Sequence, residues 1–264
     1  MNTAVMKQDA EFKMTSLIPE DLHHVVTRLP GDLRKLMTEK PIFLAGGAIR
    51  ALVGQEEIND YDLFGHDGIY LEEVARAFAA TRTGRVFKTD NAITVVSSPR
   101  KPVQFITRWT YSDPLKIAES FDFSVAQAVV WYEPSTIVDK GQWKSCISEN
   151  FYADLAAKRL RYLNPVRNED AGGSMLRVMK FLRRGYSIAP ASVGKVIARL
   201  LTGVREDNPA WSSGDEYSRA VILTSLLREV DPLTIVDGID LVEIHEFDEM
   251  ESKEEYGLQG LPNG

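Results

Sequence analysis

The sequence predicts an α+β protein in which short strands and amphipathic helices are followed by a purely helical segment. A short apolar run at 41–45 ends at a glycine pair, and helical character resumes at 48–53, which is typical of a strand-to-helix turn. Apolar runs bounded by turn residues predict further strands at 85–88, 92–98 and 103–109. Apolar residues at helical spacing predict helices at 70–81, 191–201 and 216–229.

Shorter elements are expected on either side of these. Two helices are expected at 19–29 and 31–39, where apolar positions suit packing on a core. Strands at 129–131 and 135–138 are expected to form a hairpin.

Composition and cysteine content exclude several classes of protein. No run approaches the length of about 18 apolar residues that a membrane span needs, and the N-terminus lacks the apolar core of a signal peptide. Cys146 is the lone cysteine, which excludes an internal disulfide and a cysteine-built metal site and suits a reducing compartment. The four histidines show no zinc-binding spacing. We therefore expect a soluble cytoplasmic protein with no membrane partner, whose oligomeric state the sequence does not define.

Charge is distributed unevenly along the chain, which carries a formal net charge of −7. The segment 237–255 holds nine acidic residues against one lysine, a net charge of −8, so the rest of the chain is close to +1. The segment 158–199 holds ten Lys or Arg and two acids. Two interpretations of the acidic segment are open: it competes with nucleic acid for the basic segment, or it is a solvated tail that aids solubility.

The glycine pair of the strand-to-helix turn is a candidate phosphate site. Gly46 and Gly47 allow positive φ and let the backbone approach a ligand that a Cβ would push away. The N-terminus of the following helix offers unpaired N–H groups to a phosphate, and Arg50 adds a planar cation.

Two carboxylates follow this turn. Asp60 and Asp62 are separated by one residue, so a strand at 61–64 places both on one face and Tyr61 and Leu63 on the other. Two carboxylates facing a phosphate turn form a hard oxygen site for Mg²⁺. The pattern predicts a two-metal site for phosphoryl or nucleotidyl transfer.

The motifs Gly46-Gly47-Ala48-Ile49-Arg50 and Asn59-Asp60-Tyr61-Asp62-Leu63 resemble the head signature of the class II tRNA nucleotidyltransferase/poly(A) polymerase family, within the DNA polymerase β-like superfamily. The resemblance, over about residues 40–188, implies a polymerase β-like nucleotidyltransferase head, a small mixed sheet with flanking helices, followed by a short helical neck. It also implies transfer of a nucleoside monophosphate from an NTP, with ATP or CTP expected, to an RNA or tRNA 3′ end. In that reaction Asp60 and Asp62 would hold two Mg²⁺.

The later strand at 103–108 departs from the family pattern. The family usually supplies a third carboxylate here, whereas this chain has Gln104, which can orient a nucleophile but cannot act as an anionic metal ligand or base. Arg108 matches the arginine that commonly closes this strand, and it is expected to meet triphosphate or RNA. A surface ion pair is the alternative for Arg108.

A second nucleotide motif is only partly kept. Asp122, Phe123 and Ser124 resemble the end of the family's Arg-Arg-Asp-Phe-Thr motif, while Ser120 and Phe121 replace its two arginines. In the family these groups contact the NTP. Asp122 is therefore expected to border the nucleotide, with a helix N-cap as the alternative.

The neck motif is also altered. Asp170 and Arg177 resemble members of a motif that templates the incoming base, but 171–173 replace its Pro-Leu-Arg, so CCA specificity is not predicted. Arg177 is spaced with Lys180 and Arg184 to form a basic stripe, roughly opposite Val178, Met179 and Leu182. This stripe either tracks phosphates or is a solvated helix face.

These observations predict a flexible arm at 1–16, a head at 17–165 that ends at Asn164-Pro165, a helical neck at 166–233 and an acidic tail at 234–264. The predicted function is a metal-dependent nucleotidyltransferase acting most readily on an RNA 3′ end. Two alternatives are open: an enzyme that modifies a protein or small-molecule hydroxyl, and an inactive nucleotidyltransferase fold used as a binding module. The predicted nucleotide-binding residues are Gly46, Gly47, Arg50, Arg108, Asp122, Asp170 and Arg177.

Overall fold

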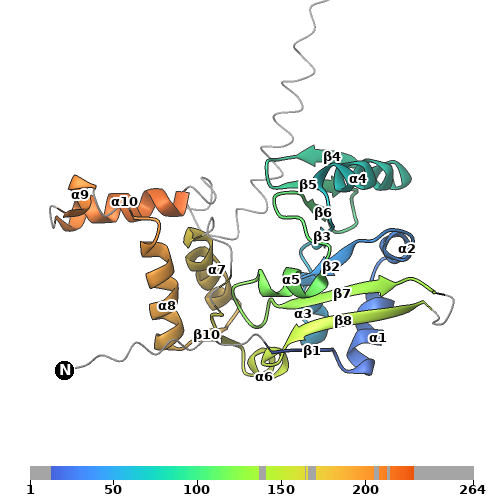
Figure 1. Cartoon of the computed structure of the whole chain (residues 1–264), viewed down its shortest axis with the longest axis horizontal. Helices are drawn as coiled ribbons and strands as arrows, with labels where there is room; N and C mark the ends of the chain where they lie inside the picture. Colours follow the sequence, from blue (N-terminus) through green and yellow to red (C-terminus); the bar gives the residue numbers. More distant parts are fainter. Residues whose placement is uncertain are drawn as a thin grey trace, which may run out of the picture.

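A computed structural model describes residues 13–136, 141–163, 165, 171–204, 208–212 and 215–228. The strands are β1 (Met14–Thr15), β2 (Phe43–Ala45), β3 (Tyr61–Phe64), β4 (Arg85–Lys88), β5 (Ala92–Val96), β6 (Val103–Ile106), β7 (Ala128–Glu133), β8 (Gln142–Ser148), β9 (Arg159–Leu160) and β10 (Ser187–Ile188). The helices are α1 (Pro19–Arg28), α2 (Gly31–Glu39), α3 (Gly47–Gly54), α4 (Gly68–Arg82), α5 (Pro114–Glu119), α6 (Phe151–Ala156), α7 (Ala171–Arg183), α8 (Pro190–Leu201), α9 (Pro209–Ser212) and α10 (Glu216–Arg228). The predicted α+β class is confirmed (Figure 1).

A mixed sheet organises the first part of the chain. In the described residues its strand order is β1-β8-β7-β2-β3-β6-β5-β4. β3 and β6 are parallel, and the other neighbouring pairs are antiparallel. The pairing of β3 with both β2 and β6 puts the strand of the two aspartates in the middle of the sheet.

One face of this sheet carries the main core. Leu44, Leu63 and Phe105 are fully buried on it, and apolar residues of α1, α2, α3 and α4 belong to the same cluster. The amphipathic pattern predicted for 70–81 accounts for α4, which buries Leu71 and Phe78. Burial of side chains of this size stabilises the fold by about 1.5–3 kcal/mol each.

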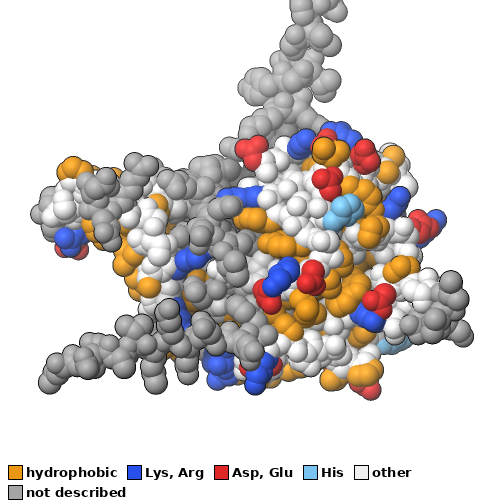
Figure 2. All heavy atoms as spheres, viewed as in Figure 1, with side chains coloured by type: hydrophobic (Ala, Val, Ile, Leu, Met, Phe, Trp, Pro, Cys, Tyr) orange, Lys and Arg blue, Asp and Glu red, His pale blue; other side chains and the backbone are white. Residues whose placement is uncertain are grey.

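The opposite face carries a second, smaller cluster. α5 packs on this face over β2, β7 and β8, and Ala45, Phe64 and Val129 are buried beneath it. Phe43 and Trp131 extend the cluster with rings 6.4 Å apart and are only partly buried. Figure 2 shows hydrophobic side chains gathered over this face.

Two predicted elements differ from the structure. The hairpin strands are β7 and β8, so the second strand begins at Gln142 and the prediction of a strand at 135–138 is wrong for the described residues 135 and 136. The antiparallel register pairs Glu133 with Gln142, which carries β7 beyond the expected turn and makes the connection longer. Met14 and Thr15, within the expected flexible arm, form β1 because the edge of β8 offers backbone partners.

The helices after the sheet pack on one another. α8 and α10 both contact α7, and Figure 1 shows these helices to the left of the sheet. β10, which follows α7, pairs in parallel with β9, which follows α6. This pairing connects the helical segment to the part of the chain that contains the large sheet. No helix in the described ranges is both long and apolar enough to cross a membrane. The division into head and neck stays a prediction, and the acidic tail at 234–264 lies outside the described residues.

Candidate active site

A cavity of about 330 Å³ lies where β3, β6 and α3 meet α7. This volume is in the range of about 300–1,000 Å³ that small-molecule sites occupy. Residues 57–62 bring acidic groups to its wall, whereas α7 brings basic ones. Carboxylates of residues 57–62 and cations of α7 therefore line the same cavity, together with Arg50 of α3 and the carboxylate of Asp122.

Asp60 and Asp62 both line this cavity. Asp62 lies opposite Gln104 in the parallel β3–β6 pair and opposite Ala45 on β2, so it shares the face that α5 partly covers. Tyr61 and Leu63 are buried in the main core on the other face. Strand alternation therefore carries both carboxylates to the same cavity, as a period of two requires.

Gln104 stands beside the carboxylate pair. Its Nε2 atom lies 3.5 Å from Oδ2 of Asp60, a long hydrogen bond, and its side chain also lines the cavity. Gln104 thus stands opposite Asp62, at the position where a third carboxylate would also face the cavity.

The glycine turn sits at the N-terminus of α3. Gly46 has φ +75°, a conformation that L side chains rarely adopt, and a Cβ there would lie 3.0 Å from the Phe121 ring. Gly47 lines the cavity, and a Cβ on it would meet nothing within 4 Å. The backbone at Gly47 therefore leaves room for a ligand at a helix N-terminus, where anions are favoured.

Arg50 is held more tightly than the sequence suggested. Its side chain lines the cavity, yet the residue is 5% exposed, its Nε atom lies 3.3 Å from Glu56, and its guanidinium stacks 4.9 Å from the Phe181 ring centroid. Tyr186 donates to the same Glu56 at 3.1 Å. Burial and the nearby Arg184 lower the pKa of Arg50, while Tyr186 and Glu56 oppose them. Arg50 thus joins α3 to α7 as well as facing the cavity.

Asp122 is a buried junction between the two walls. Its Oδ2 atom accepts hydrogen bonds from Ser174 Oγ at 2.9 Å and from Arg177 Nε at 2.7 Å. Asp122 is 2% exposed and lines the cavity together with Arg177. No helix begins at Asp122, so the N-cap alternative is wrong.

α7 supplies the basic wall. Arg177, Lys180 and Arg184 all line the cavity, so the predicted stripe faces a ligand-sized space. Of the apolar residues opposite the stripe, Val178 is buried, whereas Met179 and Leu182 are 43% and 47% exposed. Phe181 packs into the core in their place, because the cavity and the sheet lie on that side of α7.

The structure does not bring every predicted residue to the cavity. Arg108 stacks 4.7 Å from the Trp109 ring and bonds Asn91 at 3.1 Å, and it is not among the cavity-lining residues of the described chain. Asp170 lies outside the described residues. Lining residues that the sequence did not predict include Glu57, Phe64, Trp109, Phe121 and Phe181. Lys180 and Arg184 were predicted only as part of the basic stripe, by their helical spacing from Arg177, whereas no sequence signal marks Glu57 or Trp109.

The carboxylate pair fits Mg²⁺ chemically. The described residues contain no group of three or more His, Cys, Asp or Glu side chains that could hold a metal. Mg²⁺ is usually held by one or two carboxylates together with substrate phosphates and water, and does not need an all-protein cage. Asp60, Asp62 and the amide oxygen of Gln104 are hard oxygen donors on one cavity wall, so the residues present suit this ion when a phosphate ligand is bound.

Solved structures with a similar fold are CCA-adding enzymes. The Thermotoga maritima CCA-adding enzyme complexed with tRNA matches with a TM-score of 0.52 and 16% identity, over 90% of this chain and 54% of that chain. A CCA-adding enzyme with CTP matches with a TM-score of 0.50 and 14% identity, over 90% and 54%. The chain thus spans about half the length of these enzymes, and the likeness shows a nucleotidyltransferase-like fold.

A comparison of the sequence with family models identifies the family of this chain. The family model described as "Gad2: Gabija anti-defense 2 family protein" matches residues 15–158, more than half of the chain, and the chain belongs to this family. No curated protein matches it. The match includes the glycine turn, Asp60, Asp62, Gln104 and Asp122, and it ends before α7. The resemblance to nucleotidyltransferases therefore holds for the fold. The family to which the chain belongs is described by an anti-defense role.

Proposed function

We propose that this protein is a metal-dependent nucleotidyltransferase that moves a nucleoside monophosphate from an NTP to the 3′ hydroxyl of an RNA. We further propose that this transfer is the activity through which this Gabija anti-defense family member acts. The observation that carries the proposal is a single cavity lined both by Asp60 and Asp62 and by Arg177, Lys180 and Arg184. A triphosphate with bound cations has the complementary distribution of charge.

The proposed reaction is a substitution at the α-phosphorus. The acceptor oxygen forms a bond to this phosphorus, the bond to the bridging oxygen breaks, and pyrophosphate leaves. Bound Mg²⁺, held by Asp60 and Asp62, would neutralise phosphate charge and favour the ionised acceptor. Lys180 and Arg184 are suited to hold the triphosphate, and Gly47 admits it to the N-terminus of α3.

The fate of the acceptor proton follows from Gln104. Its carboxamide cannot accept a proton near neutral pH, so the proton passes to the carboxylate of Asp60 or Asp62 or to solvent. The hydrogen bond from Gln104 to Asp60 instead orients that carboxylate. An enzyme with this arrangement depends on its two aspartates for metal binding, and its acceptor proton is taken by one of them or by solvent.

The family description favours one alternative acceptor. An anti-defense protein can act by modifying a component of the defence system it opposes, so a hydroxyl on a Gabija protein is a second candidate acceptor. The glycine turn and the aspartate pair would serve a protein hydroxyl as well as a ribose. The same labelling experiment separates the two acceptors.

That experiment incubates the full chain with Mg²⁺ and each α-³²P-labelled NTP, with total RNA or with lysate of cells that carry Gabija. We expect label on RNA, and we expect the double variant Asp60→Ala/Asp62→Ala to lose it by at least about 100-fold, because loss of a metal site removes several kcal/mol of transition-state stabilisation. Asp90→Ala is the matched control, since Asp90 is exposed in the β4–β5 turn.

Thermal melting checks that each variant is folded. Label on a protein would move the acceptor assignment to the defence component. Full transfer by the double variant would end the catalytic assignment of the aspartates. No labelling with any NTP, RNA or lysate would favour the inactive binding module.

A further inference from the structure

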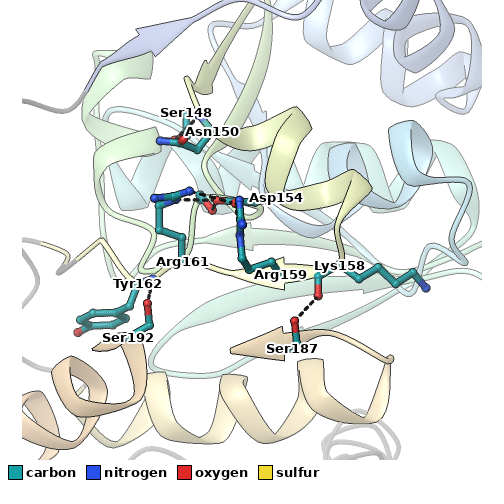
Figure 3. A network of polar contacts seen from close by, with 10 residues as sticks. Ser148, Asn150, Asp154, Lys158, Arg159, Arg161, Tyr162, Ser187 and Ser192 are labelled. Atoms are coloured by element: carbon teal, nitrogen blue, oxygen red, sulfur yellow. Dashed lines mark hydrogen bonds and ion pairs between the residues drawn. The ribbon is translucent and has the colours of Figure 1, made fainter. Parts of the chain in front are cut away.

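A second charged cluster lies at the end of the sheet-bearing part, away from the carboxylate pair. Asp154 on α6 is fully buried and accepts from Ser124 Oγ at 2.6 Å. Its carboxylate also binds two arginines, with Arg159 Nη2 at 2.6 Å and Arg161 Nε at 2.9 Å (Figure 3). One carboxylate is therefore shared by two guanidinium groups.

The cluster keeps an excess of positive charge at the surface. Asp154 can neutralise one of the two guanidinium charges, and the arginine side chains are 44% and 41% exposed. Both arginines bind Asp154 through Nε and Nη2, and no contact of either Nη1 occurs among the described residues.

Lys158 adds to this charge from a constrained position. Its φ is 45°, in the left-handed region that favours glycine, and the residue is exposed. Its carbonyl accepts from the Ser187 N–H at 2.7 Å, which holds the backbone in place. In Figure 3 the Lys158 side chain extends away from Asp154, and the residue is exposed. A fixed backbone thus presents a further exposed cation next to Arg159 in the chain.

The cluster is linked to the basic wall of the cavity through the backbone. Ser187 of β10 pairs with Arg159 of β9, and Arg184, three residues before Ser187, lines the cavity. Three residues span at most about 10 Å and paired strands lie about 4.8 Å apart, so the backbones of Arg184 and Arg159 lie roughly 15 Å or less apart. Ser192 in the first turn of α8 accepts from the Tyr162 N–H at 3.3 Å, which brings a positive helix end to the same region.

We propose that Lys158, Arg159 and Arg161 form an anchor for the phosphate backbone of the acceptor RNA, on the strand leading to the cavity. The inference rests on the proposed function, because it gives the acceptor a path to the carboxylates. Arginines fixed by a buried carboxylate present an oriented N–H edge, which suits phosphate oxygens. The anchor contacts no base, so it binds RNA regardless of sequence.

The test measures RNA binding by the full chain without NTP or Mg²⁺. The probe is a fluorescein-labelled oligouridylate of about 20 nucleotides, longer than the site of about 4–16 nucleotides that one single-strand-binding module covers. Fluorescence anisotropy gives the affinity between about 50 and 200 mM salt. Each lost phosphate contact lowers the slope of log K against log salt by about 0.7 for single strands.

We expect Lys158→Ala and Arg159→Gln each to reduce the slope by about 0.7, and the double variant by about 1.4. Lys40→Ala removes an exposed cation after α2 and is expected to leave the slope unchanged. Lys158→Ala keeps the test decisive if Arg159→Gln fails to fold, because no side-chain contact of Lys158 occurs among the described residues.

A slope and affinity equal to wild type in the folded variants would overturn the anchor, as would an absence of RNA binding by the full chain. Since binding is measured without NTP, these results are separate from failure of the transfer reaction, which the labelling experiment reports. Labelled RNA with an unchanged slope would reject the anchor alone.

Discussion

Replacing Asp122 with alanine tests whether α7 is held to the sheet by one buried carboxylate. The change removes the acceptor of two hydrogen bonds, from Ser174 Oγ at 2.9 Å and Arg177 Nε at 2.7 Å. Asp122 is 2% exposed and Ser174 is 1% exposed, so water cannot readily replace what is lost.

The magnitude follows from these contacts. A hydrogen bond to a charged group contributes about 1.5–3 kcal/mol, and a buried donor left unsatisfied costs about 1–3 kcal/mol. The Arg177 side chain is 40% exposed and can bind water instead, so the free energy lost with its hydrogen bond is taken at the low end of this range. The expected loss for Asp122→Ala is about 3–5 kcal/mol, most of it from the hydrogen bond to the buried Ser174 and the remainder from the hydrogen bond to Arg177.

Urea unfolding of the full chain measures the free energy, and thermal melting should show a fall in Tm of roughly 6–20 °C. Asp122→Asn is the matched control, because it keeps one acceptor oxygen while it loses the charge and exchanges the other oxygen for an NH2 group, for an expected cost of about 1–2 kcal/mol. A loss below about 1 kcal/mol in Asp122→Ala would refute the reasoning and would mean that α7 is held by apolar packing instead.

Two further predictions concern the other carboxylates. Gln104→Glu places a third carboxylate beside Asp60, so we expect a lower Tm without metal and a larger Mg²⁺-induced rise in Tm than in wild type, since an ion that binds the folded state stabilises it; an unchanged Mg²⁺ response would contradict this. Burial acts to raise the pKa of Asp154, but hydrogen bonds from Arg161, Ser124 and Arg159 outweigh it and hold the pKa below the ordinary value of 3.8. A carboxyl whose pKa is lowered by folding contributes its full stabilisation above its unfolded pKa and loses this contribution as pH falls through its folded pKa. We therefore expect the unfolding free energy of wild type to fall more below about pH 5 than that of Asp154→Asn. Urea unfolding at a series of pH values measures both. Parallel pH curves for the two proteins would rule out this role of Asp154.

Local patterns in the sequence were sufficient to predict several features of the structure. Two adjacent glycines between a strand and a helix predict the turn at α3, because few other residues adopt the φ of +75° found at Gly46. Strand alternation predicts that Asp60 and Asp62 share a face, since the period of a strand is two whatever the strand packs against. Helical spacing predicts that Arg177, Lys180 and Arg184 form one stripe.

Other features depended on contacts between distant segments. The Asp122–Arg177 pair joins residues 55 positions apart, and nothing local to Asp122 distinguishes an ion pair from a helix cap. The predicted strand ended at residue 131, but β7 continues to Glu133 because Glu133 pairs with Gln142 of β8. This pairing, and not the strand propensity of Glu133, keeps the residue extended.

The side of α7 that faces the core was also decided by tertiary structure. Met179 and Leu182 have the helical spacing of core residues, yet both are exposed, while the basic residues face the cavity. A sequence shows which residues share a helix face, because that depends on a rotation of about 100° per residue. It does not show which face meets the sheet, because that is decided by the free energy of packing the whole helix, including the Asp122 ion pair and the stacking of Arg50 on Phe181.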